Sequence, residues 1–267
     1  MASIPTLTSL SPVQGHDGLT LTVNGTGLQG TIKVNFGAKQ VNPTSVTATA
    51  VTCVIPEVPA GQYNVTVTTP NVTSNFLPFY YIAPPQVQTL GTHTGPAGAT
   101  PLSVFGQALA TATGVTFGPL GPGTGLQVVS DTTLQVITPA HGAFATGTCT
   151  DTVNVTVTSL GGVSIPQGSN SQYTFYQAPT VTGVLPTSAS VGSLLTLNGS
   201  CLADVVSTLF TPAGGGPAVA ARFTAISNTV MTTVVPSGLA AGTYNITVVT
   251  PGGQTLPVSF AVFTVPV

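Results

Sequence analysis

Apolar and polar residues alternate along several short stretches of the chain. Residues 63–68 read YNVTVT, which places Tyr63, Val65 and Val67 on one side and their polar neighbours on the other. A period of two is typical of a β-strand with one face in a core and the other in water. The same alternation recurs in residues 153–158 and 244–249.

A second alternating stretch lies near the start of the first and last thirds of the chain. Leu19, Leu21 and Val23 are expected to face inward together, as are Leu195 and Leu197. The Thr and Val residues of these stretches suit an extended backbone, because branched side chains restrict χ1 and favour strands. No stretch shows a convincing helical period, so the sequence predicts an all-β protein.

The alternating phrase belongs to a longer repeat. Its central Asn stands at positions 64, 154 and 245, at intervals of 90 and 91 residues, which is the size of a whole small domain. Each repeat holds about seven short strand signals with a turn signal roughly every ten residues, which is the pattern of an immunoglobulin-like β-sandwich. We therefore predict three tandem sandwiches: unit one (residues 1–83), unit two (residues 84–177, with longer loops) and unit three (residues 178–267).

Five short motifs recur in the same order in each unit. In unit one they read SPVQG (11–15), NGTGL (24–28), NFG (35–37), VIP (54–56) and AGQYNVTV (60–67). This order resembles the IPT/TIG family of Ig-like domains, and the resemblance covers nearly the whole chain. Unit two lacks the proline and the aromatic of the last motif, and unit three has LF where the family has FG. The resemblance implies three early-set Ig-like sandwiches more than any activity, because such domains occur as spacers, adhesive stalks, accessories of carbohydrate enzymes and parts of receptors and transcription factors.

The repeated phrase has a structural explanation in this fold. Tyr63 and Tyr244 follow Gly61 and Gly242 by two residues and resemble the tyrosine corner that begins strand F of an Ig-like sandwich. Every sandwich needs that strand, and the Asn is its first outward residue.

The links between the units are short and contain proline. They read YIAPPQ (81–86) and YQAPT (176–180). Proline removes backbone freedom, so we expect stiff hinges and a rod-like array of units.

Charged residues are scarce and exclude two classes of partner. They make up 3% of the chain, and the only cations are Lys33, Lys39 and Arg222. Three scattered cations cannot neutralise a row of phosphates or hold an anionic membrane surface, which argues against nucleic acid and membrane partners. A formal net charge of −2 gives little repulsion between copies, so the surface suits close packing among copies or on a protein partner.

No membrane or secretion segment is expected in this chain. Although the mean hydropathy is +0.47, apolar residues alternate with Thr and Ser, and no stretch approaches the roughly 18 apolar residues that a spanning helix needs. The start, MASIPTLTSLSP, has neither a basic nor an apolar region of the kind that a signal peptide carries.

The sequence offers little support for a catalytic site. The three histidines are not spaced as metal ligands, and no Cys-x-x-Cys motif occurs. The one local cluster, His141, Cys149 and Asp151, holds the groups of a nucleophilic triad, but all three would have to converge from one Gly/Thr-rich loop without a rigid scaffold. We therefore expect no enzyme activity, no metal and no cofactor.

The cysteines number three, with one in each unit. Cys53 shares a face with Val51 and Ile55 and is expected in the core. Cys149 and Cys201 are expected at the facing ends of units two and three, where an interdomain disulfide could join the units. The simpler interpretation, which the sequence favours, is two unpaired thiols, because sequence alone cannot fix their Cα separation.

These features lead to two hypotheses on function. The first is a non-catalytic structural or display protein, either a phage virion decoration or fibre component or a bacterial surface filament or stalk, located on a virion or an extracellular surface. Its partner would be a protein, either further copies of itself or a capsid or surface protein. The second is an adhesion module that binds a carbohydrate or a receptor. Phe79, Tyr80 and Tyr81 are consecutive, so at least one points outward and is the best candidate contact. The loop before Asn154 is also long, with 14 residues after Pro139, and long loops often carry binding.

Overall fold

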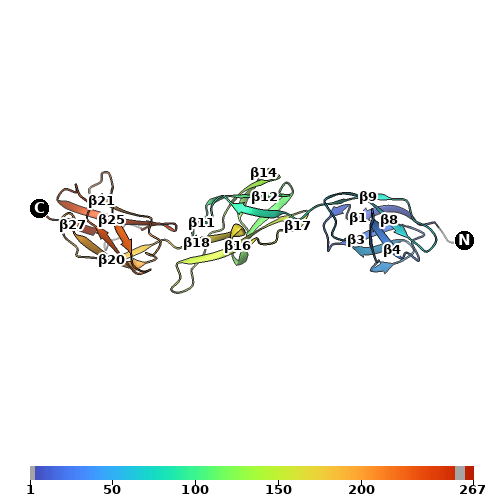
Figure 1. Cartoon of the computed structure of the whole chain (residues 1–267), viewed down its shortest axis with the longest axis horizontal. Helices are drawn as coiled ribbons and strands as arrows, with labels where there is room; N and C mark the ends of the chain where they lie inside the picture. Colours follow the sequence, from blue (N-terminus) through green and yellow to red (C-terminus); the bar gives the residue numbers. More distant parts are fainter. Residues whose placement is uncertain (1–3, 256–261) are drawn as a thin grey trace.

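Three β-sandwiches follow one another along a rod, with the chain termini at its two ends (Figure 1). A computed structural model describes residues 4–255 and 262–267. Within these residues the regular structure consists of strands and two short 3-10 turns, Gly118–Leu120 and Gly168–Ser171, as the all-β prediction requires. Nowhere in these ranges is there a helix with the length and apolarity needed to cross a membrane.

Unit one consists of two sheets. The first has the order β1-β3-β7-β6 and comprises β1 (Thr6–Ser11), β3 (Thr20–Thr26), β7 (Ala50–Val54) and β6 (Ser45–Val46). The second has the order β2-β9-β8-β4-β5 and comprises β2 (Gln14–Gly15), β9 (Leu77–Tyr81), β8 (Gly61–Thr68), β4 (Lys33–Phe36) and β5 (Lys39–Val41). The chain therefore changes sheets between β1 and β2, and β2 pairs in parallel with β9.

Unit two repeats this arrangement. Its first sheet, in the order β10-β12-β15-β14, comprises β10 (Gln86–Leu90), β12 (Pro101–Gln107), β15 (Thr133–Ile137) and β14 (Thr124–Ser130). Its second, in the order β11-β18-β16-β13 with β17 on β16, comprises β11 (Thr94–Pro96), β18 (Gln172–Tyr176), β16 (Thr150–Ser159), β13 (Ala112–Phe117) and β17 (Gly162–Val163).

Unit three has the same two layers. Its first sheet, in the order β19-β20-β24-β23, comprises β19 (Thr180–Leu185), β20 (Leu194–Ser200), β24 (Val230–Val234) and β23 (Phe223–Ala225). Its second, in the order β22-β21-β25-β26 with β27 on β25, comprises β22 (Val219–Ala221), β21 (Ser207–Pro212), β25 (Gly242–Thr250), β26 (Gly253–Gln254) and β27 (Val262–Val265). Each sheet uses strands of one unit alone, and we propose the boundaries after residues 83 and 177 on that basis.

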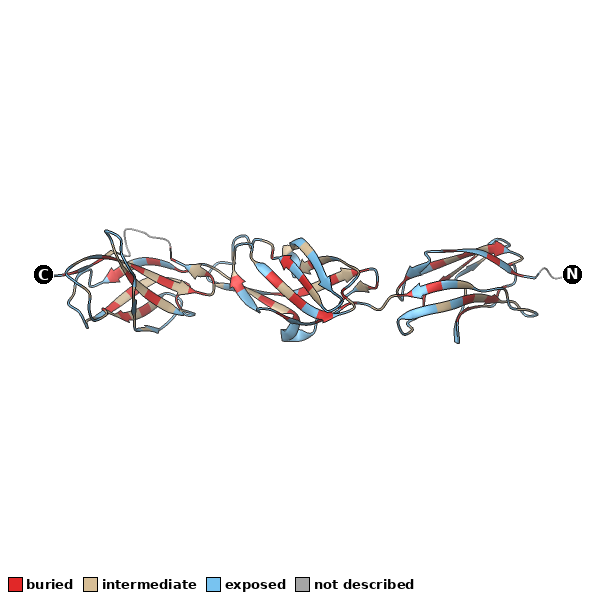
Figure 2. Ribbon diagram, turned by 90° about the horizontal axis from the view of Figure 1, so that it is seen from above, coloured by how far each residue is buried: buried red, intermediate tan, exposed pale blue. Residues whose placement is uncertain are grey.

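The cores follow the predicted alternation, which is visible as red and pale bands along the strands in Figure 2. Val65 and Val67 are fully buried, and each unit has its own apolar cluster. One predicted core position is wrong: Leu19 is 39% exposed. It lies one residue before β3, and the residue of the opposite sheet that it meets is Gly15 of β2, which has no side chain to cover it.

The first strand of each unit departs from period two. In β1 the buried residues are Leu7 and Leu10, three apart, and β10 and β19 have the same pattern. The cause is a β-bulge in each strand, which shifts the register against the second strand. Opposite each bulge lies a glycine so close to the first strand that an added Cβ would overlap a backbone carbonyl oxygen; these are Gly25, Gly106 and Gly199. This contact explains why the second motif keeps a glycine in all three units.

Units one and three each contain a tyrosine corner, as the resemblance implied. The Tyr63 hydroxyl donates to the Pro59 carbonyl oxygen at 2.7 Å, and the Tyr244 hydroxyl donates to the Ala240 carbonyl oxygen at 2.9 Å. Both bonds tie strand F to the loop before it.

Candidate functional site

The junction between units one and two is tightly packed. The turn between β16 and β17 lies against the linker, and a Cβ on Gly161 would overlap the Ala83 carbonyl oxygen. Its neighbour Gly162 faces the His16 ring of unit one, whose atoms lie 3.4 Å from where a Cβ would stand. His16 is thus a contact between the units.

The junction between units two and three uses the same contact. The turn between β25 and β26 lies against the second linker, and a Cβ on Gly252 would overlap the Gln177 carbonyl oxygen. In both junctions a hairpin turn of the following unit holds the linker backbone. Sequence reasoning missed this feature, although the Gly-Gly pairs at 161–162 and 252–253 were a signal for it.

The second junction also brings two cysteines together. Cys149 lies just before β16 and Cys201 just after β20, and the structure pairs them as a disulfide with their Cα atoms 5.4 Å apart. This separation lies within the usual range for a disulfide, so the geometry suits the covalent link between units rather than the two free thiols that the sequence favoured.

Cys201 occupies a special backbone position. It is the first residue after the second strand of its unit, where unit one has Gly27 and unit two has Ala108. All three have a left-handed backbone, with φ of 57° at Cys201, 67° at Gly27 and 55° at Ala108. A residue with a side chain pays about 1 kcal/mol to adopt this conformation. Unit three therefore has a strained cysteine at the place where unit one has an unstrained glycine.

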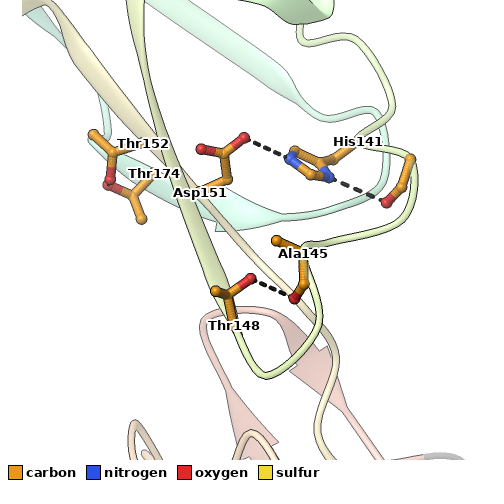
Figure 3. Close-up of polar contacts among 7 residues, drawn as sticks. His141, Ala145, Thr148, Asp151, Thr152 and Thr174 are labelled. Atoms are coloured by element: carbon orange, nitrogen blue, oxygen red, sulfur yellow. Dashed lines mark hydrogen bonds and ion pairs between the residues drawn. The ribbon is translucent and has the colours of Figure 1, made fainter.

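The long loop that ends at Cys149 is braced from within, as Figure 3 shows. The His141 Nε2 atom lies 2.9 Å from Asp151 Oδ2, and its Nδ1 atom lies 3.1 Å from the Gly142 carbonyl oxygen. The ring stacks on Phe144 with centroids 4.0 Å apart, and its side chain is only 6% exposed. The His141–Asp151 pair thus fixes the base of the loop that carries Cys149.

This geometry does not assemble a nucleophile. His141 and Asp151 do meet, but the third member of the cluster, Cys149, is bonded to Cys201 and has no thiol to ionise. Within residues 4–255 and 262–267, no three His, Cys, Asp or Glu side chains gather as metal ligands would. The two ring nitrogens of His93 contact the Gln172 carbonyl oxygen and the Thr89 hydroxyl, and neither contact is to His141 or Asp151.

Cys53 is a core residue, as expected. Its side chain is fully buried, and burial raises the pKa of its thiol to about 12. It is a free cysteine that stays protonated at neutral pH.

The three consecutive aromatics of β9 divide into two classes. Phe79 and Tyr81 are buried, so as contact residues these two candidates are wrong, whereas Tyr80 is 48% exposed. The Tyr81 hydroxyl donates to Asp17 Oδ1 at 2.8 Å, and burial together with this bond raises the pKa of Tyr81 to about 12. The alternation of the strand therefore leaves Tyr80 as the outward aromatic of the three.

Comparisons with known proteins identify a family. A model of the IPT/TIG domain matches residues 5–81 and 179–262, which are units one and three. A search of curated proteins found no match.

Several solved structures show a distant likeness. A protein crystallised with a xylogluco-oligosaccharide is 17% identical, with a TM-score of 0.42, over 98% of this chain and 60% of that one. The plexin A4 extracellular region is 18% identical, with a TM-score of 0.39, over 98% of this chain and 24% of that one. SGBP-B of a Bacteroides ovatus mixed-linkage glucan utilization locus, in complex with a heptasaccharide, is 17% identical, with a TM-score of 0.29, over 98% of this chain and 70% of that one. The chain thus spans less than two thirds of the first two structures, and all three TM-scores are below 0.5.

Proposed function

The chain belongs to the IPT/TIG domain family, and we propose that it is a non-catalytic, rigid rod that serves a structural or display role on the outside of a larger assembly. The setting we propose is a phage virion, as a decoration or fibre component, or a bacterial surface, as a filament or stalk. Its partner is a protein, either further copies of the chain or a protein of the capsid or surface.

The observation that carries this proposal is the pair of clamped junctions. Gly161 and Gly252 each bring a hairpin turn onto a linker backbone, and the Cys149–Cys201 pair adds a covalent link at the second junction. Such contacts restrict the movement of one unit relative to the next, which a flexible tether does not require. Held in line, the three units keep the two ends of the described chain far apart (Figure 1), as a spacer must.

The surface supports the same role. With charged residues at only 3% of the chain, the polar part of the surface consists mainly of Thr, Ser, Asn and Gln. Little charge has to be desolvated or paired when such a surface packs against a neighbour.

A second candidate function is adhesion to a carbohydrate or a receptor. The specific observation in its favour is Tyr80, which is 48% exposed on a sheet whose neighbouring positions on β9 are buried. Exposed tyrosines with an apolar body and a polar tip are common contact residues.

Light scattering coupled to size-exclusion chromatography, with negative-stain images of the same fractions, tests the structural role. Elongated particles are expected, either single or in regular polymers, rings or trimers. Regular polymers would assign the role to self-assembly, and an elongated monomer would assign it to attachment to another protein. Compact particles in which the units fold back on one another would overturn the proposal.

A further inference from the structure

A row of three side chains crosses the outer face of the second sheet in unit one. Tyr80 of β9 stands directly opposite Gln62 of β8 on one side and Gln14 of β2 on the other. All three are exposed, and paired positions in a sheet place their side chains on the same face, with Cβ atoms about 5 Å apart in an antiparallel pair. The phenol ring is therefore flanked by two amides. We call these residues the Gln-Tyr-Gln row.

The fold itself does not require this row. In unit two the same register positions hold Thr94, Thr174 and Thr152, and the hydroxyls of the last two lie 2.8 Å apart. In unit three they hold Ser188, Thr264 and Thr243. Small hydroxyl residues thus satisfy the sheet in two of the three units, and only unit one replaces all three with larger side chains.

The Tyr80 hydroxyl also differs from the hydroxyls of three other tyrosines. Tyr63, Tyr81 and Tyr244 each donate to a protein acceptor. In the part of the chain that the structure describes, the Tyr80 hydroxyl has no such partner, so it contributes no internal bond that would explain its presence.

Further exposed side chains of β8 and β9 lie next to the Gln-Tyr-Gln row. Along β8 the next outward residue after Gln62 is Asn64, which pairs with Pro78 of β9. Phe76, which comes just before β9, is 58% exposed. An aromatic and proline stripe, Pro78 and Tyr80, therefore runs beside an amide stripe, Gln62 and Asn64.

We propose that this face binds a neutral carbohydrate chain. Amide groups donate and accept hydrogen bonds at once, which matches sugar hydroxyls that do the same. The face of an aromatic ring carries partial negative charge and attracts the polarised C–H bonds of a sugar ring. The inference rests on the second of the two proposed functions and names the ligand class and the site.

The charges around the row favour a neutral ligand over a charged one. None of the residues of the two stripes is an Asp, Glu, Lys or Arg, so the stripes carry no formal charge. The two lysines of this sheet, Lys33 of β4 and Lys39 of β5, lie on strands beyond β8 from Tyr80, and Lys33 donates to Asn42 Oδ1 at 2.7 Å. An acidic polysaccharide or an anionic peptide would find no group to pair with on these stripes.

The test begins with the whole chain on an array of immobilised neutral and acidic glycans. Saturation-transfer NMR then follows with soluble cellohexaose, mannohexaose and xylohexaose, together with any neutral glycan that the array retains, at millimolar concentration. The key variant is the triple change Gln14→Thr, Gln62→Thr and Tyr80→Thr, which installs the kind of residue that units two and three carry. Thr264→Ala, at the corresponding place in unit three, is the matched control.

Binding to a neutral glycan is expected, weakened at least about tenfold by the triple change and unaffected by the control. Because threonine already occupies this place twice in the chain, the triple variant is expected to unfold at the same temperature as the parent. Absence of binding to every neutral glycan, or binding that the triple change leaves intact, would overturn the inference. Self-association lost in the triple variant, without glycan binding, would assign the face to a second copy and would also overturn it. Particle shape in negative stain is independent of all these results, so the structural role stands or falls separately.

Discussion

The covalent link between Cys149 and Cys201 gives the most quantitative prediction. The two cysteines are 52 residues apart in sequence, and closing a loop of that length removes unfolded-state entropy worth about 4 kcal/mol. Replacing both cysteines with serine is expected to remove this amount from the combined stability of units two and three.

A second double variant separates the link from the backbone strain at Cys201. Changing Cys149 to serine and Cys201 to glycine also breaks the link, but glycine adopts the left-handed backbone without the cost of about 1 kcal/mol. This variant is expected to lose about 3 kcal/mol and to be more stable than the double serine variant by about 1 kcal/mol.

Urea unfolding read by hydrogen-exchange mass spectrometry measures both losses unit by unit. Peptides of unit one serve as the internal control, since that unit contains neither cysteine. A thiol count accompanies the measurement: the unfolded protein without reductant should expose one reactive thiol, that of Cys53. In the folded protein that thiol should react slowly at neutral pH, because it is buried and its pKa is raised to about 12.

Two results would refute this reasoning. Three reactive thiols in the unreduced, unfolded protein would show that no link exists. Equal unfolding midpoints for the parent and both double variants would show that the link contributes nothing, whatever its geometry.

Three further predictions concern single side chains. Tyr244→Phe should lower stability by about 1 kcal/mol through the lost corner hydrogen bond, whereas Tyr80→Phe, which loses no internal bond, should leave the melting temperature unchanged. Gly106→Ala should destabilise unit two by about 1 to 3 kcal/mol in urea unfolding, because its Cβ meets a backbone carbonyl, whereas Gly98→Ala, which meets nothing, should be neutral. The folded-state pKa of Tyr81, at about 12, lies above its ordinary value of 10.0, so its contribution to stability is complete below about pH 10 and is lost as the pH rises towards about 12. Tyr81→Phe should remove this part of the alkaline loss, and a pH series of urea midpoints that is identical for parent and variant would contradict it.

The alternation of inward and outward residues along each strand explains how much of the fold could be predicted from the sequence. Alternation at Val65 and Val67 sets which face of the strand is buried, and together with the recurring motifs it was enough to predict three sandwiches. The alternation predicts burial wrongly where the backbone departs from regular strand pairing. The bulges in β1, β10 and β19 come from contacts with the second strand, and Leu19 lies beyond the paired residues.

The candidate site was less predictable, because it depends on distances between segments. Sequence placed Cys149 and Cys201 at facing ends of two units but could not supply the 5.4 Å between their Cα atoms. Likewise, three consecutive aromatics ensured an outward ring, yet only the register of β9 against β2 and β8 identified Tyr80 and its flanking amides.

Small-angle X-ray scattering of the dilute monomer tests the rigid rod most directly. A compact protein of this length has a radius of gyration of about 18 Å, whereas three units of about 90 residues in contact along a line give about 28 Å. The account predicts a value of at least about 28 Å with the scattering profile of a straight rod. A value near about 18 Å, or a profile that requires a broad mixture of bent arrangements, would contradict it.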